Sequence, residues 1–175
     1  MADPIPRATL RELAEPLLLD LRGDAADPAF ASAAARVLGI APPTEPNTVA
    51  EAGEVSLLWL GPDEWLVVAP ASASDLAQRL EAALQGLHHS VCDVSAGRVV
   101  LELAGAEARA VLESATSLDL HPRAFGPGGC AQTGLARVPA ILQMIEATHR
   151  FRIYVRASFA PYIKAWLERA IAEPS

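Results

Sequence analysis

The order in which short strand-like and helix-like segments follow one another constrains the fold of this chain most strongly. Up to residue 95 the hydrophobic pattern predicts β-α-β-β-α-β, and residues 98 to about 172 predict β-α-β-β-α with a last strand that the pattern does not define. Each order is that of a split βαβ unit. The most economical architecture is therefore α+β, with two ferredoxin-like βαββαβ units that share a sheet in one compact domain. This domain is expected to span residues 15–172, with pseudo-repeats at about 15–95 and 98–172, after an N-terminal lead at residues 1–14.

The clearest helix signals lie around residue 30. Asp27 is a natural N-cap, Pro28 takes the first helical position, where a missing N–H costs nothing, and Gly39 ends the helix. Phe30 begins the apolar face of this helix. Residues 41–54 contain three prolines, which remove backbone donors and predict a surface loop.

Two hairpins are predicted from pairs of β-rich runs around turn residues. The first joins residues 55–60 to residues 64–69 through a Gly-Pro-Asp turn. We expect Trp59 or Trp65 to pack on the sheet at this hairpin. The second hairpin is formed by residues 89–104 and turns at an Ala-Gly pair.

The other elements follow from caps and periodicity. They are a helix capped by Ser72 or Ser74, a helix at 106–115, a loop at 116–130, strands at 133–137, 140–146 and 151–155, and a final helix from about Ser158. The last strand alternates apolar residues with Arg152 and Arg156, so one of its faces is cationic. The inward face of the final helix is predicted to contain Phe159, Ile163, Trp166, Leu167 and Ala170.

The charge of the chain argues against two classes of partner. Its 14 basic and 21 acidic residues give a net charge of −7 without a basic run, which disfavours nucleic acid and an anionic membrane. Residues 1–97 carry 5 basic and 14 acidic groups, whereas residues 98–175 carry 9 and 7. The apolar runs are far shorter than the roughly 20 residues of a membrane helix. With no secretory signal in the sequence, a cytoplasmic location is expected.

The residues themselves predict no catalytic, cofactor-binding or metal site. The four histidines are not spaced as ligands on one helix, and the glycines before Cys130 do not form a phosphate-binding loop. Cys92 is interpreted as a small core residue of a strand. Cys130 lies in a glycine-rich loop without a basic residue nearby to activate it. Asp93 is expected to be buried in a structural pair with Arg98.

An ordered set of short motifs provides the remaining information. The motifs are Leu-Arg-Gly-Asp (21–24), Asp-Pro-Ala-Phe (27–30), the segment 43–47, Trp-Leu-Gly-Pro-Asp-Glu-Trp-Leu (59–66), Asp-Val-Ser (93–95) with Gly97-Arg98, Leu-Asp-Leu-His-Pro (118–122) with Phe125, Cys-Ala-Gln-Thr (130–133), and Tyr-Val-Arg (154–156) with Ser158. Together they resemble the gamma subunit family of heterotetrameric sarcosine oxidase. The resemblance runs from about residue 15 to residue 170, and the motifs at 60–65 and 130–133 are its most specific parts.

A second resemblance concerns the fold. Residues 93–112 are also similar to the wider aminomethyltransferase-like family, which includes the glycine cleavage T protein. That family folds as ferredoxin-like units, so the resemblance implies an aminomethyltransferase-like fold. This implication agrees with the repeated order of elements.

The first resemblance also implies a function. The family's complex demethylates sarcosine to glycine, passes the one-carbon unit to tetrahydrofolate as methylenetetrahydrofolate, and converts oxygen to hydrogen peroxide. It implies that this chain is a non-catalytic structural or assembly subunit beside the alpha, beta and delta subunits, with enzyme activity only in the complex. FAD, FMN, NAD and zinc are then expected in the partner subunits and no cofactor in this chain. The alternatives are a stand-alone folate-binding aminomethyltransferase-like protein and a homo-oligomeric domain without a small ligand.

Two features are the candidate subunit interface. A long irregular loop in a small chain usually has a function, and arginines on a sheet face suit bidentate pairing with carboxylates. The loop is at residues 118–133, and the alternative is an ordinary connector beside a solvated sheet face. The candidate interface residues are Phe125, Gly128, Gly129, Cys130, Arg152 and Arg156.

Overall fold

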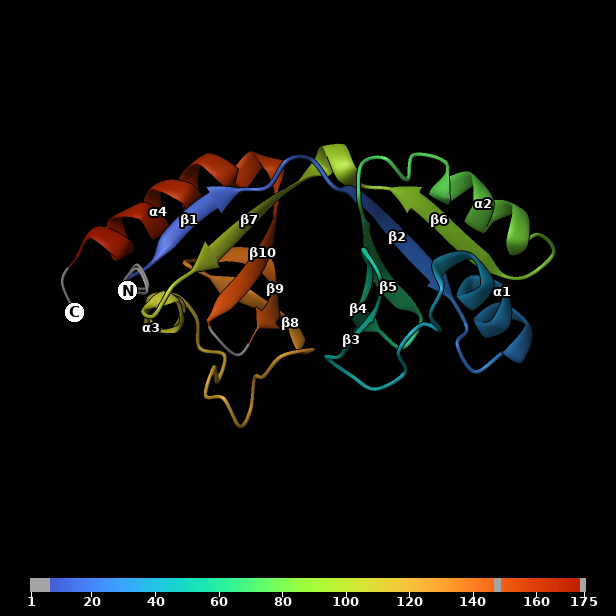
Figure 1. The fold of residues 1–175 in the computed structure, drawn as a ribbon, viewed down its shortest axis with the longest axis horizontal. Helices are drawn as coiled ribbons and strands as arrows, with labels where there is room; N and C mark the ends of the chain where they lie inside the picture. Colours follow the sequence, from blue (N-terminus) through green and yellow to red (C-terminus); the bar gives the residue numbers. More distant parts are fainter. Residues whose placement is uncertain (1–6, 147–148, 174–175) are drawn as a thin grey trace, which may run out of the picture. The chain divides into compact units, whose positions relative to one another are not determined.

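The computed structural model describes residues 7–146 and 149–173, and the chain forms two compact units (Figure 1). We call Glu15–Ala96 the inserted unit, because it interrupts the other unit in sequence. The terminal unit consists of Met1–Ala14 together with Gly97–Ser175. The boundary between residues 96 and 97 falls between the two pseudo-repeats that the sequence predicts.

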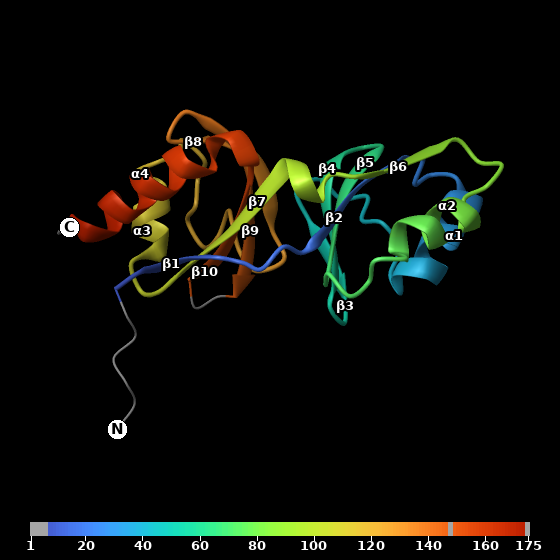
Figure 2. The same cartoon turned by 90° about the horizontal axis from the view of Figure 1, so that it is seen from above.

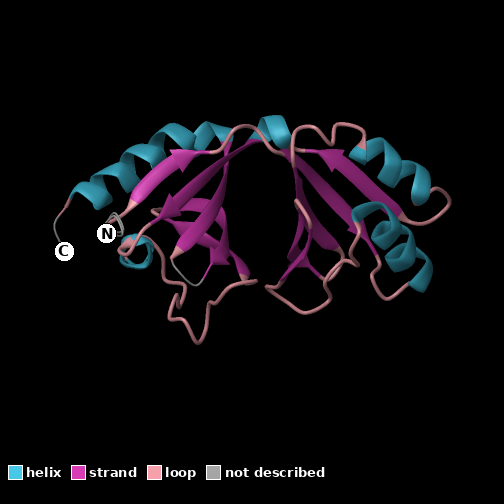
Figure 3. Cartoon of the chain, in the orientation of Figure 1, coloured by secondary structure: helices cyan, strands magenta, loops and turns pink. Residues whose placement is uncertain are grey.

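The inserted unit is an antiparallel sheet with helices on one face. Its strand order is β3-β4-β5-β2-β6, and every neighbouring pair is antiparallel. Without the edge strand β3, this arrangement is that of a ferredoxin-like βαββαβ unit. Figure 3 shows both helices on the same side of this sheet. The elements are β2 (Leu17–Gly23), α1 (Pro28–Leu38), β3 (Val49–Ala52), β4 (Val55–Gly61), β5 (Glu64–Ala69), α2 (Leu76–Ala83) and β6 (His89–Asp93).

Local signals fix α1 where the sequence predicts it. The Asp27 carboxylate accepts the Ala29 N–H at 2.8 Å, and Gly39 ends the helix with φ of +79°. Phe30 is fully buried against β2, where a Cβ atom on Gly23 would lie 2.1 Å from its ring. The strand therefore needs glycine at this position so that the helix can pack closely.

The terminal unit repeats the same plan with one strand taken from the start of the chain. Its strand order is β1-β7-β10-β9-β8, again antiparallel throughout. Thus β1 occupies the place that β6 has in the inserted unit, and β8 occupies the place of β3. Figures 1 and 2 show α3 and α4 on the same side of the sheet. The elements are β1 (Thr9–Glu12), β7 (Arg98–Ala104), α3 (Ala108–Glu113), β8 (Cys130–Leu135), β9 (Val138–Glu146), β10 (Arg150–Arg156) and α4 (Ala160–Ala172).

Each unit has a core of its own between helices and sheet. In the inserted unit the largest buried side chains are Trp65 and Phe30. In the terminal unit Phe151, Ile153 and Val155 of β10 face buried residues of α3 and α4. This confirms the alternation that the sequence predicts for the last strand.

The pairing of strands corrects two expectations. The units do not share a sheet, since each has five strands of its own. The predicted hairpin of residues 89–104 is also wrong, because β6 pairs with β2 and β7 pairs with β1 and β10. A 3-10 turn, Ser95–Gly97, separates the two strands. Spacing along the chain indicates two strands, but their partners are selected by tertiary packing.

Two segments expected to be irregular contain strands. The N-terminal lead includes β1, which supplies the last strand that the sequence pattern left undefined. The loop expected at residues 41–54 includes β3, which pairs with β4 at the sheet edge. Both strands have four residues and form sheet edges, so their hydrophobic alternation is too short to be recognised.

Smaller corrections concern element ends. The strand expected at 133–137 begins at Cys130 and ends at Leu135. The N-cap of α2 is Asp75, not Ser72 or Ser74. Phe159 precedes α4 in a 3-10 turn and is 37% exposed, so it does not belong to the inward face.

Candidate functional site

The predicted interface residues occupy two different environments. Phe125 and Cys130 are buried, with 5% and 0% of their surfaces exposed, so their side chains belong to the interior of the terminal unit. Gly128 is exposed, Gly129 is half-buried, and both belong to the long loop between α3 and β8. Within this set, the exposed surface comes from the loop glycines and the two arginines.

The glycines shape the end of this loop. Gly128 has φ of +77°, and a Cβ atom on Gly129 would lie 2.9 Å from the Gly126 carbonyl oxygen. The Met144 N–H donates to the Gly129 carbonyl at 3.0 Å, so the loop end is attached to β9. The loop is therefore held in place against the sheet before β8 begins.

The two arginines of β10 have different neighbours. Arg152 lies directly opposite Glu102 of β7, and Glu102 is 5% exposed. Glu102 also lies opposite Arg11 of β1, whose Nη2 is 2.7 Å from its Oε1. Between the two arginines, Tyr154 is fully buried and donates from its hydroxyl to Gln143 Oε1 at 2.5 Å. The cationic face predicted for this strand is therefore divided by a buried tyrosine, and Arg152 has a carboxylate beside it.

Arg156 belongs instead to an open pocket of about 480 Å³, which we call the arginine pocket. Arg98 at the start of β7, Arg156 at the end of β10 and Arg137 line it. Gln132, Thr133 and five further residues of β8 and β9 complete its wall. Arg98 and Arg156 are directly opposite each other in the antiparallel pair. No acidic side chain occurs among the described residues that line the pocket.

A tight turn between β8 and β9 positions Arg137. Leu135 pairs with Val138, so Ala136 and Arg137 alone form the turn, with φ of +47° and +72°. Two-residue turns with positive φ usually contain Asn or Gly. The Tyr162 hydroxyl donates to the Ala136 carbonyl at 2.9 Å and connects the turn to α4.

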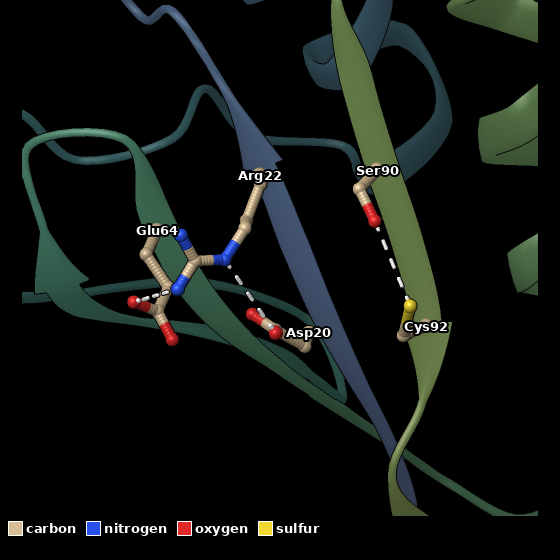
Figure 4. Close-up of polar contacts among 5 residues, drawn as sticks. All are labelled: Asp20, Arg22, Glu64, Ser90 and Cys92. Carbon is tan, nitrogen blue, oxygen red and sulfur yellow. Dashed lines mark hydrogen bonds and ion pairs between the residues drawn. The ribbon is translucent and has the colours of Figure 1, made fainter.

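A polar cluster lies on three strands of the inserted unit (Figure 4). Arg22 Nη2 is 2.6 Å from Glu64 Oε2, and its Nε is 3.8 Å from Asp20 Oδ2. The charge of Glu64 raises the pKa of Arg22. On β6 the Ser90 hydroxyl oxygen is 3.6 Å from the Cys92 sulfur. Cys92 is exposed at a sheet edge, so its interpretation as a core residue is wrong.

The expected buried pair of Asp93 and Arg98 is also corrected. Asp93 is exposed, and its Oδ1 accepts the Ser95 N–H at 2.9 Å. Hydrogen bonds from the Ser95 hydroxyl and N–H hold the pKa of the Asp93 carboxyl below its ordinary value. Asp93 therefore organises the turn after β6.

The part of the chain that the structure describes has neither a metal-binding cluster nor a membrane-spanning helix. Over residues 7–146 and 149–173, no group of three or more His, Cys, Asp or Glu side chains could hold a metal ion. Within the same residues no helix has the length and apolarity required to cross a membrane.

Known proteins resemble this chain over nearly its whole length. A sequence model described as "Sarcosine oxidase, gamma subunit family" matches residues 22–173. The sarcosine oxidase subunit gamma of Corynebacterium sp. (strain P-1) is 40% identical over 165 residues, which cover 94% of this chain and 80% of that protein. A chain in the heterotetrameric sarcosine oxidase from Corynebacterium sp. U-96, in complex with pyrrole 2-carboxylate, superposes with a TM-score of 0.88 at 36% identity. That match covers 94% of this chain and 84% of the other.

A more distant likeness confirms the fold. The glycine cleavage system aminomethyltransferase T from Bartonella henselae superposes with a TM-score of 0.70 at 19% identity, over 92% of this chain and 45% of that protein. At this identity only the fold is shared, and the predicted aminomethyltransferase-like fold is confirmed. The gamma-subunit motifs found in the sequence agree with the family match, and the chain therefore belongs to the sarcosine oxidase gamma subunit family.

Proposed function

We propose that this chain is a non-catalytic structural and assembly subunit of a heterotetrameric sarcosine oxidase. The observation that carries the proposal is the likeness to a named gamma subunit, which is 40% identical and covers 94% of this chain. The TM-score of 0.88 with a chain of a heterotetrameric sarcosine oxidase supports the same role. The likeness to aminomethyltransferase T covers less than half of that protein, so it does not favour a stand-alone folate-binding protein.

The proposal assigns the chemistry to the partner subunits. These are the alpha, beta and delta subunits, and they hold FAD, FMN, NAD and zinc. The complex demethylates sarcosine in the cytoplasm, with oxygen and tetrahydrofolate as co-substrates. This chain would supply surface for assembly, since it combines an attached loop with the exposed Arg156 on β10 and the exposed Arg137 in the turn after β8.

Omission of the chain tests the proposal directly. We expect co-expression of all four subunits to give a complex with sarcosine oxidase activity, and omission of this chain to prevent stable assembly. The purified chain alone should show no flavin absorbance and no oxidase activity. Activity of the isolated chain, or full assembly without it, would contradict the proposal.

Charge reversal tests the proposed interface. We expect the double variant Arg152→Glu, Arg156→Glu to co-purify with the partners in a lower ratio than the wild type. The variant should also dissociate from them at a lower salt concentration, because bidentate pairs with carboxylates are lost. The matched control reverses Arg36 and Arg79, two exposed arginines of the inserted unit. Equal behaviour of both variants would show that the β10 face is not an interface.

A deletion within residues 126–129 tests the loop separately. We expect weaker assembly, because Gly128 is exposed at the turn and the loop would be shortened there. The melting temperature of the isolated chain serves as the control for folding. A deletion variant that assembles like the wild type would remove this loop from the interface.

A further inference from the structure

The arginine pocket brings three arginine side chains together, and no acidic side chain is among the described residues that line it. Arg98 and Arg156 are directly opposite in β7 and β10, and like charges in this position repel each other. Arg137 adds a third guanidinium group from the turn after β8. Arg137 and Arg156 are exposed, so both are accessible from outside the chain. An anionic group in the pocket would convert this repulsion into attraction.

Three carboxylates of the same unit are engaged in ion pairs elsewhere. Glu102 is 2.7 Å from Arg11, Glu107 is 2.8 Å from Arg7, and Glu12 is 2.8 Å from Lys164. These pairs use acidic side chains of β1, β7 and the start of α3. The described lining of the pocket therefore consists of arginines, neutral polar groups and apolar residues.

The turn that carries Arg137 is conformationally costly. Ala136 and Arg137 both have positive φ, which is unfavourable for residues with a Cβ atom. The bond from Tyr162 to the Ala136 carbonyl holds the turn at α4. Strained backbone of this kind persists most often where a side chain must be held in a particular place. Here the side chain held in place is that of Arg137.

A further arginine, Arg169, lies in a neighbouring depression, and its Nε is 3.7 Å from Glu173 Oε1. A second depression of about 410 Å³ is lined by Arg137, Tyr162, Ala165, Trp166 and Arg169. Arg137 lines both depressions, so they are adjacent. Tyr162 is 48% exposed and offers an aromatic ring beside Arg137 and Arg169. Two adjacent depressions of this kind fit an extended polypeptide better than a single small anion.

We propose that the arginine pocket binds carboxylate side chains in an acidic segment of a partner subunit. Arg137 and Arg156 are the main contacts, and guanidinium groups can hold carboxylates through two parallel hydrogen bonds. The segment continues over Tyr162 towards Arg169. This inference rests on the proposed function, and it adds the chemistry by which the partner is recognised.

The test mixes the full chain with its separately purified cognate alpha, beta and delta subunits and measures its association with them. Arg137→Gly and Arg156→Gln are combined in one variant, and Arg36→Gln is the matched control on the inserted unit. We expect the double variant to bind with a Kd at least about tenfold higher and with a shallower salt dependence. We expect Arg156→Lys, which keeps the charge, to recover part of the affinity.

Folding is controlled with the same variants. Glycine is favoured in a turn with positive φ, so Arg137→Gly should leave the melting temperature of the isolated chain unchanged or raise it. Weaker assembly without a lower melting temperature then supports a binding role for Arg137. Weaker assembly that is matched by a large fall in melting temperature would overturn it.

The outcomes separate this inference from the proposed function. Failure of the wild-type chain to bind its cognate subunits would overturn both. Wild-type binding together with unchanged Kd and salt dependence in the double variant would overturn only the inference. Titration of citrate into the isolated chain tests for a small-molecule site. Citrate binding that the double variant loses, with assembly unaffected, would replace the partner segment with a small carboxylate.

Discussion

Trp65 is the largest fully buried side chain and joins α1 to the sheet of the inserted unit. Its ring stacks on Phe30 with centroids 6.0 Å apart, and its Nε1–H donates to the Pro43 carbonyl at 2.8 Å. We expect Trp65→Ala to lower the free energy of unfolding by about 3–5 kcal/mol, measured by urea denaturation. Trp65→Phe should lower the free energy of unfolding by less, because it keeps an aromatic ring against Phe30. An unchanged midpoint for Trp65→Ala would contradict this role.

Arg109 is a buried cation in the terminal unit, and it is 9% exposed. Its guanidinium lies 5.4 Å from the centre of the Phe151 ring, and Nη2 is 3.5 Å from Met144 Sδ. Among the described residues, Nε and Nη1 have no hydrogen-bond partner. We expect Arg109→Met to preserve the free energy of unfolding or raise it by up to about 2 kcal/mol, because an unpaired buried charge is removed. Calorimetry should show a lower free energy of unfolding for Arg109→Ala, because this substitution leaves a cavity. An equal decrease in Arg109→Met and Arg109→Ala would contradict the explanation.

His89 has an acceptor at each ring nitrogen. Nδ1 is 2.9 Å from the Leu87 carbonyl oxygen and Nε2 is 3.0 Å from Glu81 Oε2. The hydrogen bond to Leu87, opposed by burial and aided by Glu81, raises the pKa of His89. The protonated ring therefore adds stability below its ordinary pKa of about 6.5, and this stability is lost as pH rises through the raised pKa.

The pH dependence of melting checks the role of His89. We expect the melting temperature of the wild type to exceed that of His89→Gln by more at about pH 6 than at about pH 8.5. Glu81→Gln should reduce the difference, since one acceptor loses its charge. A difference that is constant or grows with pH would contradict the direction of the shift.

Strand β1 is hard to recognise in the sequence, but it pairs with β7 along its whole length. Leu10 pairs with Leu103, and Arg11 pairs with the buried Glu102. We expect deletion of residues 7–12 to lower the free energy of unfolding of the terminal unit by about 3 kcal/mol or more, because Glu102 loses its ion pair with Arg11 and β7 becomes an edge strand. Hydrogen exchange should accelerate in β7 and stay unchanged in β2 and β5. If amide protons of β7 exchange equally slowly in the wild type and in the deletion variant, β1 does not stabilise the sheet.

Elements with local signals could be predicted from the sequence, and elements that depend on distant partners could not. The cap at Asp27 and the αL residue Gly39 define α1 within a dozen residues, and the first hairpin has its turn between its strands. Strand β1 has four residues, and its partner lies about ninety positions away. No periodicity within so short a segment indicates such a pairing.

Among the arginines of the arginine pocket, too, some are indicated by the local sequence pattern and others depend on distant strand pairing. Arg156 could be selected because it alternates with apolar residues in a strand of clear period. Arg98 could not, because its place opposite Arg156 depends on the pairing of β7 with β10. The sequence pattern places Arg137 in a strand, because the turn lacks the Asn-Gly sequence that usually marks a tight turn. The signal that could have suggested the pocket is the placement of arginines at the ends of two predicted strands.

For the whole molecule, the continuity of each unit in sequence determines what can fold alone. The inserted unit is one uninterrupted segment, whereas the terminal unit needs both ends of the chain. We expect a fragment of residues 15–96 to unfold cooperatively, observed by circular dichroism and dispersed amide resonances. A fragment of residues 97–175 should do so only when a peptide of residues 1–14 is added. Cooperative unfolding of residues 97–175 without the peptide would contradict the role of β1 as the missing strand.

The charges of the units differ as well. The inserted unit has 3 basic and 12 acidic residues, and the terminal unit has 11 and 9. The net charge of −7 therefore arises entirely from the inserted unit. Added salt should accordingly screen repulsion within the inserted unit more than within the terminal unit.

The adjacent ends of the inserted unit have a consequence for the order of folding. Leu18 and Val94 are joined by a backbone hydrogen bond of 2.9 Å, so once this unit has formed, its entry and exit are neighbours. During synthesis β1 emerges long before β7, and an unfolded chain would have to close a loop of about 85 residues to pair them. A folded inserted unit reduces that loop to about ten residues and lowers the entropic cost by about 2 kcal/mol. Folding of the inserted unit thus brings β1 close to β7 and favours completion of the terminal sheet.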